Sequence, residues 1–82
     1  MNRQDMLAIV REELCIAAPD VAPDADEMAA LRHDLGVDSL AVLEFVARLE
    51  YRFNLSVPDD AWPQLTSIGA VLDYLAGRLV TC

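Results

Sequence analysis

Residues 34–53 read DLGVDSLAVLEFVARLEYRF, and this stretch decides how the chain folds. Gly36 is a turn signal, and an apolar pattern with helical spacing begins directly after Asp38. Asn54, which tolerates a left-handed backbone conformation, follows the pattern. The sequence therefore predicts a helix over residues 39–53, preceded by a turn and ended by Asn54.

Two separate apolar stripes run along this predicted helix. One covers an arc of roughly 100° and is expected to pack against other helices. Its members are Val42, Phe45, Val46, Leu49 and Phe53. The second stripe is centred roughly 140° from the first. Its members are Leu40, Leu43 and Ala47. Two interpretations of the second stripe are open: a neighbouring loop and short helix cover it, or it is an exposed patch that docks a partner.

The segments on either side add three more helices. The first helix is predicted over residues 3–16 and the last over residues 68–79, with Thr66 or Ser67 as its cap. The apolar faces of these two helices comprise Met6, Leu7, Val10 and Leu14, and Ile68, Val71, Leu72 and Leu75. The solvated side of the first helix is assigned to Arg3, Asp5, Arg11, Glu12 and Glu13. Pro58 opens a short helix that Pro63 limits, and Trp62 within it is expected to pack against the second helix.

A long segment rich in proline and acids joins the first two helices. It spans residues 17–30, and we expect a solvated loop there with one helical turn near residues 27–31. The predicted fold is all-α: a small four-helix bundle of three longer helices and one short helix, with a long loop between helices 1 and 2. At 82 residues, the chain is expected to form a single domain, residues 1–82.

Composition excludes several classes of function. Lys and Arg number 6 against 14 Asp and Glu, which gives a net charge of −8. This balance argues against binding to nucleic acid and against a polybasic membrane anchor. Without an apolar run of spanning length or a signal-peptide core, a cytoplasmic protein is expected. Cys15 and Cys82 are expected to be free thiols, His33 a solvated loop residue and Tyr51 a surface residue, and no metal-ligand spacing is present.

Ser39, at the start of the second helix, is the candidate functional residue. A serine there is usually a cap, but the Glu or Gln three residues later that would complete a capping box is missing. If Asp38 is the cap, Ser39 takes the first helical position with its hydroxyl towards solvent. A phosphate ester on Ser39 would then lie at the positive end of the helix dipole, near unpaired N–H groups. This position suits a phosphodiester-linked group.

The run Leu31-x-x-Asp34-Leu35-Gly36-Val37-Asp38-Ser39-Leu40 resembles the attachment motif of acyl carrier proteins. Later landmarks of that family are matched in order by Leu43-Glu44, Leu49-Glu50 through Phe53, Val57-Pro58-Asp59-Asp60 and Thr66-Ser67-Ile68. The resemblance implies a non-catalytic carrier with 4′-phosphopantetheine on Ser39, installed from coenzyme A by a phosphopantetheinyl transferase. The thiol of that arm would hold acyl, aminoacyl or polyketide intermediates as thioesters.

The resemblance also implies roles for neighbouring residues. Asp38 would contact the transferase and shape the start of the helix, and Gly36 would allow the turn. Partner enzymes (an acyltransferase, ketosynthase or adenylating enzyme) would touch Leu40, Leu43, Glu44, Ala47 and Arg48 of a monomeric carrier. Arg48 and Arg52 depart from the acidic second helix of fatty-acid carriers. That departure favours a bacterial polyketide or related natural-product pathway, such as antibiotic biosynthesis, over fatty acid biosynthesis.

An alternative function follows from the same residues without any prosthetic group. A small helical interaction module would use the stripe of Leu40, Leu43 and Ala47 as its docking face and Ser39 as a plain cap. Modification of Ser39 by a phosphopantetheinyl transferase distinguishes the two.

Overall fold

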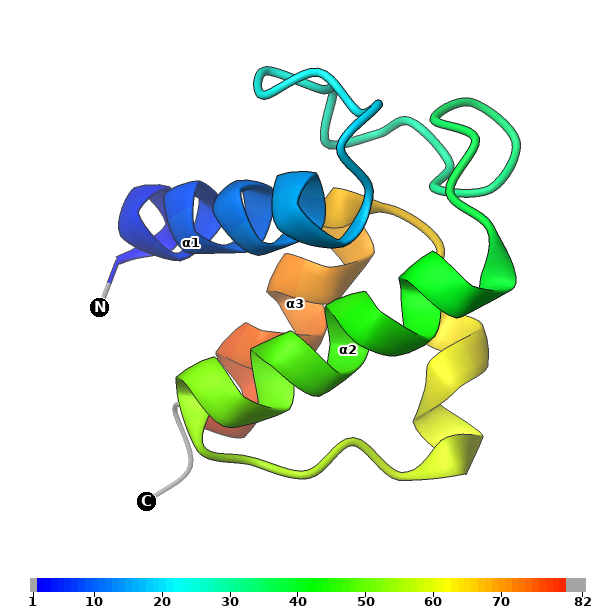
Figure 1. The fold of residues 1–82 in the computed structure, drawn as a ribbon. Helices are drawn as coiled ribbons and strands as arrows, with labels where there is room; N and C mark the ends of the chain where they lie inside the picture. The colour runs from blue at the N-terminus through cyan, green and yellow to red at the C-terminus, as the bar shows by residue number, and fades with distance from the viewer. Residues whose placement is uncertain (1, 80–82) are drawn as a thin grey trace.

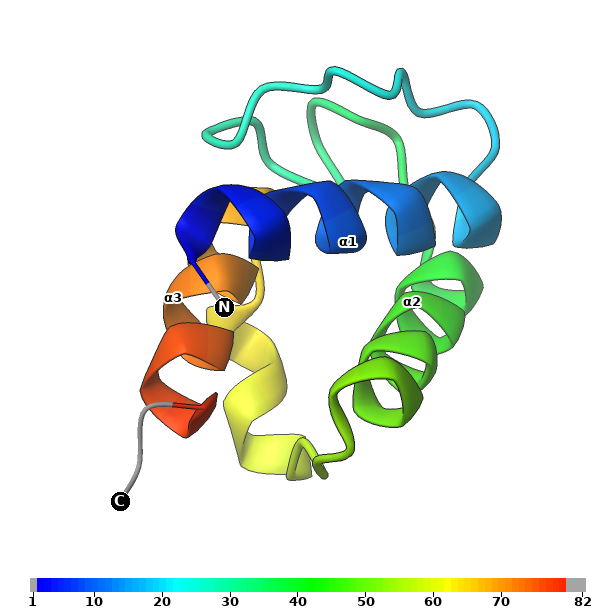
Figure 2. The ribbon, with the colours of Figure 1, turned by 90° about the vertical axis from the view of Figure 1, so that its left-hand side faces the viewer.

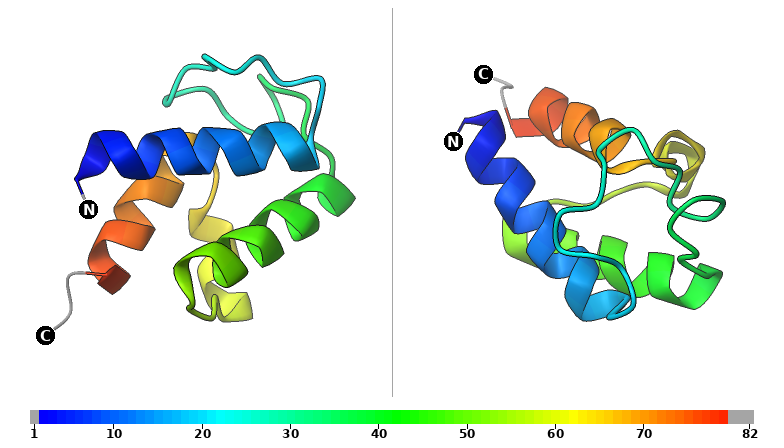
Figure 3. Two further views of the ribbon diagram at one scale, coloured as in Figure 1. Left: turned by 60° about the vertical axis from the view of Figure 1, so that its left-hand side comes forward. Right: turned by 90° about the horizontal axis from the view of Figure 1, so that it is seen from above.

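The computed structural model describes residues 2–79 of the chain. Its elements, in order, are α1 (Arg3–Ala17), α2 (Ser39–Phe53), the 3-10 helix η1 (Asp59–Gln64) and α3 (Ile68–Leu79). α1 lies across α2 and α3 and contacts both, while η1 contacts α3 (Figures 1 and 3). The prediction of an all-α fold with three longer helices and one short helix is confirmed.

The ends of the helices follow from local side-chain chemistry. At α1, the Asn2 side chain accepts a hydrogen bond from the backbone N–H of Asp5 at 2.8 Å. At α3, the Ser67 hydroxyl accepts one from the N–H of Ala70 at 3.1 Å, so Ser67 rather than Thr66 is the cap. α2 ends where Asn54 adopts the left-handed conformation, with φ 54° and ψ 53°. The predicted bounds of α2 and its stop at Asn54 are therefore confirmed.

The core lies where the three long helices converge. Its largest fully buried side chains include Leu14 from α1, Phe45 from α2 and Leu72 from α3. The predicted apolar faces of α1 and α3 are confirmed, since their members are buried except Leu7, which packs half-buried against the core. α2 contributes Phe45, Val46 and Leu49 to this core, and its second stripe plays no part in it, since Leu40 and Leu43 are exposed.

The segment between α1 and α2 is anchored rather than freely solvated. Its side chains Val21, Ala25, Leu31 and Val37 are buried in the core. The Gly69 N–H donates to the Glu27 carbonyl at 2.9 Å, and the Leu31 N–H donates to the Thr66 carbonyl at 2.9 Å. In Figure 2 this segment passes over α1 before it descends to α2. These backbone hydrogen bonds tie the segment to the start of α3.

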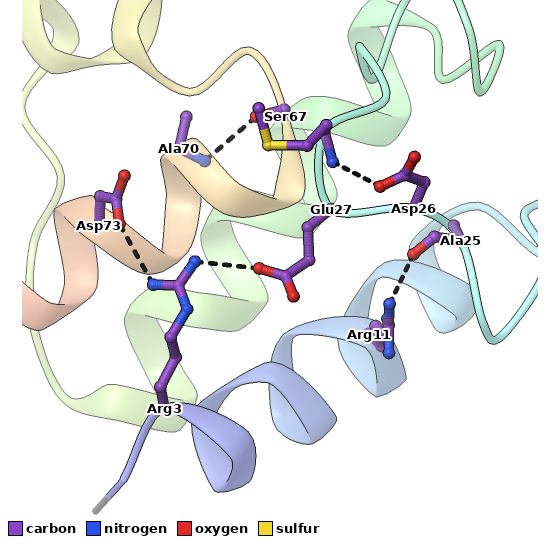
Figure 4. Close-up of polar contacts among 9 residues, drawn as sticks. Arg3, Arg11, Ala25, Asp26, Glu27, Ser67, Ala70 and Asp73 are labelled. Atoms are coloured by element: carbon purple, nitrogen blue, oxygen red, sulfur yellow. Dashed lines mark hydrogen bonds and ion pairs between the residues drawn. The ribbon is translucent and has the colours of Figure 1, made fainter.

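Two ion pairs reinforce this anchoring from the side chains. Arg3 of α1 donates to Glu27 at 2.9 Å and to Asp73 of α3 at 3.2 Å (Figure 4). The hydrogen bonds that Arg3 donates to Glu27 and, next in size, to Asp73 raise the pKa of Arg3 above its usual value. Arg11 donates to the Ala25 carbonyl at 2.7 Å, also visible in Figure 4. Both Arg3 and Arg11 of α1 thus hold the connecting segment.

The expectation of one helical turn near residues 27–31 is wrong. The backbone there forms turns, and Ala30 makes an isolated antiparallel bridge with Ser67 instead. A helical turn over residues 27–31 would join the Leu31 N–H to the Glu27 carbonyl, but the Leu31 N–H donates to Thr66 and the Glu27 carbonyl accepts from Gly69. The long-range bridge therefore replaces the local turn.

Candidate functional site

Ser39 is the first residue of α2, and its side chain is exposed. The capping role belongs to Asp38, whose Oδ1 accepts a hydrogen bond from the Ala41 N–H at 2.8 Å. The Ser39 hydroxyl makes no hydrogen bond to the rest of the described chain. Since helical N–H groups donate to carbonyls four residues earlier, those of Ser39 and Leu40 have no acceptor within the helix. The predicted arrangement, with Asp38 as cap and Ser39 exposed beside it, is confirmed.

A tight turn before α2 fixes the position of Ser39. Gly36 has a φ of 68°, the left-handed region that favours glycine. The Asp34 carboxylate accepts a hydrogen bond from the Ala30 N–H at 2.9 Å, and the Val37 N–H donates to the Leu31 carbonyl at 2.8 Å. The predicted turn at Gly36 is therefore present, and hydrogen bonds made by Asp34 before it and Val37 after it hold it in place.

The stripe of Leu40, Leu43 and Ala47 is open to solvent. Leu40 is 77% exposed and Leu43 is 51% exposed, and Ala47 is also exposed. The interpretation that a loop and a short helix cover this stripe is therefore wrong. The stripe begins directly after Ser39, so an apolar surface adjoins the exposed hydroxyl.

Arg48 and Arg52 are held by an acid of α1. The Glu13 carboxylate accepts from Arg48 at 3.2 Å and from Arg52 at 2.7 Å. Arg48 also pairs with Glu44 at 3.1 Å, and the hydrogen bonds that Arg48 donates to Glu44 and, next in size, to Glu13 raise the pKa of Arg48. We call Glu13, Glu44, Arg48 and Arg52 the α1–α2 ion-pair cluster. It joins the two helices on the side next to Ala47.

The assignment of Glu13 to the solvated face of α1 is wrong. Glu13 is only 6% exposed and is the one buried charged residue among those described. The sequence held a signal for this position, because Glu13 follows Val10 by three residues and Met6 by seven. That spacing places it on the buried face of the helix. Its burial is possible because two guanidinium groups satisfy both carboxylate oxygens.

Two hollows flank α2. The first, of about 570 Å³, is a shallow groove lined by Glu13, Glu44, Ala47, Arg48, Tyr51 and Arg52. The second, of about 720 Å³, is lined by Ala30, Leu31, Arg32, His33, Val42, Asp59, Trp62, Pro63, Leu65 and Thr66. Because Val42 is less than one turn after Ser39, the second hollow lies beside the start of α2.

The remaining predicted residues mostly lie where the sequence indicated. Trp62 is half-buried against the core and donates from Nε1 to the Val57 carbonyl at 3.4 Å. Tyr51 is 90% exposed, and His33 is also exposed. The thiol of Cys15 is free, and Cys82 lies outside the described residues.

Metal-binding and membrane-spanning features were sought across residues 2–79. No group of three or more His, Cys, Asp or Glu side chains there is placed to hold a metal ion. None of the helices in that range combines the length and apolar character needed to cross a bilayer.

The residues at the start of α2 fit a phosphodiester-linked arm. An exposed hydroxyl without a hydrogen-bonding partner in the described chain is accessible to another enzyme. The first-turn N–H groups and the helix dipole place partial positive charge beside it, which stabilises a phosphate there. Covalent 4′-phosphopantetheine supplies a thiol that holds acyl groups as thioesters. The chain presents the Ser39 hydroxyl clear of the core.

Comparison with known proteins identifies the same chemistry. The family model described as "Phosphopantetheine attachment site" matches residues 4–75. An acyl carrier protein of Helicobacter pylori strain J99 is 35% identical over 72 residues, covering 88% of this chain and 87% of the relative. One from Cyanidioschyzon merolae is 38% identical over 79 residues, covering 92% and 82%. One from Amoebophilus asiaticus is 32% identical over 76 residues, covering 93% and 90%.

These matches extend over nearly the whole chain and include both the turn at Gly36 and the exposed Ser39. Members of this family receive their arm from a phosphopantetheinyl transferase and work with biosynthetic enzymes. The chain belongs to the acyl carrier protein family: it is a non-catalytic carrier with a covalently attached 4′-phosphopantetheine.

Proposed function

We propose that Ser39 carries the 4′-phosphopantetheine arm and that the loaded arm is presented to partner enzymes. One observation supports this above all: Ser39 stands exposed at the first position of α2 because Asp38 performs the capping. Asp38 and Gly36 serve the site by fixing the direction in which α2 begins. The hydroxyl is therefore available to a transferase without loss of a helix cap.

We further propose that partners dock on the exposed stripe of Leu40, Leu43 and Ala47, with Glu44 and Arg48 at its edge. Apolar patches rimmed by polar side chains are typical of protein interaction sites. Because the stripe adjoins Ser39, a partner seated on it has its catalytic centre within reach of the arm. These partners are a phosphopantetheinyl transferase and an acyltransferase, ketosynthase or adenylating enzyme, each meeting a monomeric carrier.

The charge of α2 bears on the kind of pathway. Within Ser39–Phe53, Glu44 and Glu50 are balanced by Arg48 and Arg52, so the helix sums to zero. The chain as a whole carries −8. A neutral docking helix selects partners differently from an acidic one, since matched charges favour some enzymes and exclude others. We infer a polyketide or related natural-product pathway of a bacterium, and fatty acid synthesis is the alternative that the loaded species would distinguish.

A hollow with apolar side chains in its wall lies close to Ser39. We propose that the acyl group on the arm rests in this 720 Å³ hollow beside Val42, where Leu31, Trp62 and Leu65 line the wall. Trp62 is the only tryptophan of the chain. Its fluorescence is therefore expected to shift when a long acyl chain is loaded and to stay unchanged with acetyl. An identical spectrum with both groups would contradict this placement.

The decisive experiment is transfer of the arm to the purified protein. Incubation with coenzyme A, Mg²⁺ and a broad-specificity phosphopantetheinyl transferase should add one phosphopantetheine, measured as intact mass. Ser39→Ala should abolish the addition. Ser56→Ala is the matched control, because Ser56 is also exposed but lies in the α2–η1 connection and should leave the addition intact. Wild-type protein that stays folded and unmodified would instead favour an interaction module without a prosthetic group.

A further inference from the structure

The α1–α2 ion-pair cluster lies beside the proposed docking stripe, not apart from it. Glu44 and Ala47 line the same groove as Glu13, Arg48 and Arg52. The two arginine side chains are about two-fifths exposed, 39% for Arg48 and 40% for Arg52, although each is bound to the buried Glu13. The two arginines therefore face the groove while one acid of α1 holds them.

The arrangement restrains where positive charge lies on the docking helix. Arg side chains are long and flexible, and a free guanidinium samples positions well away from its helix. Here both carboxylate oxygens of Glu13 are occupied, one by each arginine, and a buried carboxylate stays in place. Glu12 approaches Arg52 only to 3.9 Å and is 59% exposed, so it cannot replace Glu13.

We propose that Glu13 is a positioning residue for partner recognition, which draws Arg48 and Arg52 towards α1 at the edge of the docking stripe and prevents them from extending over it. This inference rests on the proposed docking function of α2. The partner it fits has a basic surface around an apolar contact for Leu40 and Leu43. Complementarity to a chain of net charge −8 requires basic groups, and freed arginines would repel them.

A count of the charges around the α1–α2 ion-pair cluster yields two matched variants that isolate the role of Glu13. Glu13, Glu44 and Glu50 against Arg48 and Arg52 sum to −1. Glu13→Gln changes this sum to zero and removes the buried carboxylate that Arg48 and Arg52 share, which leaves Arg48 paired with Glu44 alone. Glu12→Gln removes the same unit of charge from the neighbouring position but leaves both arginines bound to Glu13. The two variants therefore differ in restraint and not in net charge.

The test is the kinetics of arm transfer to the full-length protein by the phosphopantetheinyl transferase at low salt. Glu13→Gln should raise KM by about three- to ten-fold with little change in kcat, the usual size of an interfacial charge effect. Glu12→Gln should change KM by less than about two-fold. The double variant Glu13→Gln/Arg52→Gln restores the local sum of −1 and should return KM towards the wild-type value.

The double variant separates recognition from stability. It lacks the Glu13–Arg52 pair entirely, so a merely structural role predicts that KM stays raised or rises further. Arg52→Gln alone, which keeps the Glu13–Arg48 pair, should leave KM equal to or below that of the wild type, and this holds even if Glu13→Gln proves unable to fold.

Three results would overturn the proposal: equal KM values for Glu13→Gln and Glu12→Gln, no recovery in the double variant, or a raised KM for Arg52→Gln. A wild-type protein that accepts no arm would instead remove the proposed function, and this inference with it.

Discussion

The sharpest test of the site compares Asp38, which caps α2, with Ser39, which is exposed beside it. The Asp38 carboxylate accepts the Ala41 N–H at 2.8 Å, whereas the Ser39 side chain is exposed and makes no hydrogen bond within the described residues. Replacement of an N-cap by alanine lowers the free energy of unfolding by about 1 kcal/mol, within a range of about 0.5–2 kcal/mol. For a domain of this size, each kcal/mol corresponds to a drop in Tm of about 4–8 °C. Asp38→Ala should show this loss.

Ser39→Ala should behave oppositely in stability. No hydrogen bond is lost, and alanine has a higher helix propensity than serine by a few tenths of a kcal/mol. The free energy of unfolding should therefore stay within about 0.5 kcal/mol of the wild type. Asp38→Asn is the matched control, since its amide oxygen still accepts the Ala41 N–H and asparagine caps about as well as aspartate.

The measurement is urea unfolding of the unmodified protein, followed by far-UV circular dichroism, together with thermal melts. A Ser39→Ala variant that loses as much stability as Asp38→Ala would refute the reasoning, because the hydroxyl would then be held by the protein. An Asp38→Ala variant as stable as the wild type would also refute the reasoning, because Asp38 would then not be the cap of α2.

Three more substitutions test the turn, the core and the docking stripe. Gly36→Ala should lower the free energy of unfolding by about 1–2 kcal/mol, because alanine is strained at a φ of 68°. The added Cβ meets no atom within 4 Å, so backbone strain is the whole effect, and an unchanged urea midpoint would contradict this. Phe45→Ala, at a fully buried position, should remove about 3–5 kcal/mol and leave little folded protein in the same unfolding assay. Leu43→Ala, at a half-exposed position, should change stability by less than about 0.5 kcal/mol yet raise KM for arm transfer; an unaltered KM would argue against docking on the stripe.

Much of the fold was predictable because it depends on short-range pattern. The start of α2 at Ser39 follows from the turn at Gly36 and the cap at Asp38, and its end follows from the left-handed tolerance of Asn54. The buried face of α2 around Phe45 follows from the spacing of apolar residues. Each of these signals lies within a few residues of the feature it determines, so the sequence shows it directly.

The candidate site was predictable in the same way, but only in part. The exposed position of Ser39 follows from the assignment of Asp38 as the cap, which is a local argument. Whether the stripe of Leu40 and Leu43 is covered was left open by periodicity, because a second apolar face is equally compatible with a core neighbour. Only the packing of α1, η1 and α3 shows that no element covers it.

The amino-acid sequence alone determined the helices, their ends and the motif around Ser39, since these depend on propensity and spacing along the chain. The tertiary structure decided that Glu13 is buried between Arg48 and Arg52, residues 35 and 39 positions away in the chain. It also decided that the segment before α2 is tied to α3 through Glu27 and Gly69. Charge pairing and backbone hydrogen bonding between distant residues depend on which surfaces meet, and these surfaces exist only once the helices have packed.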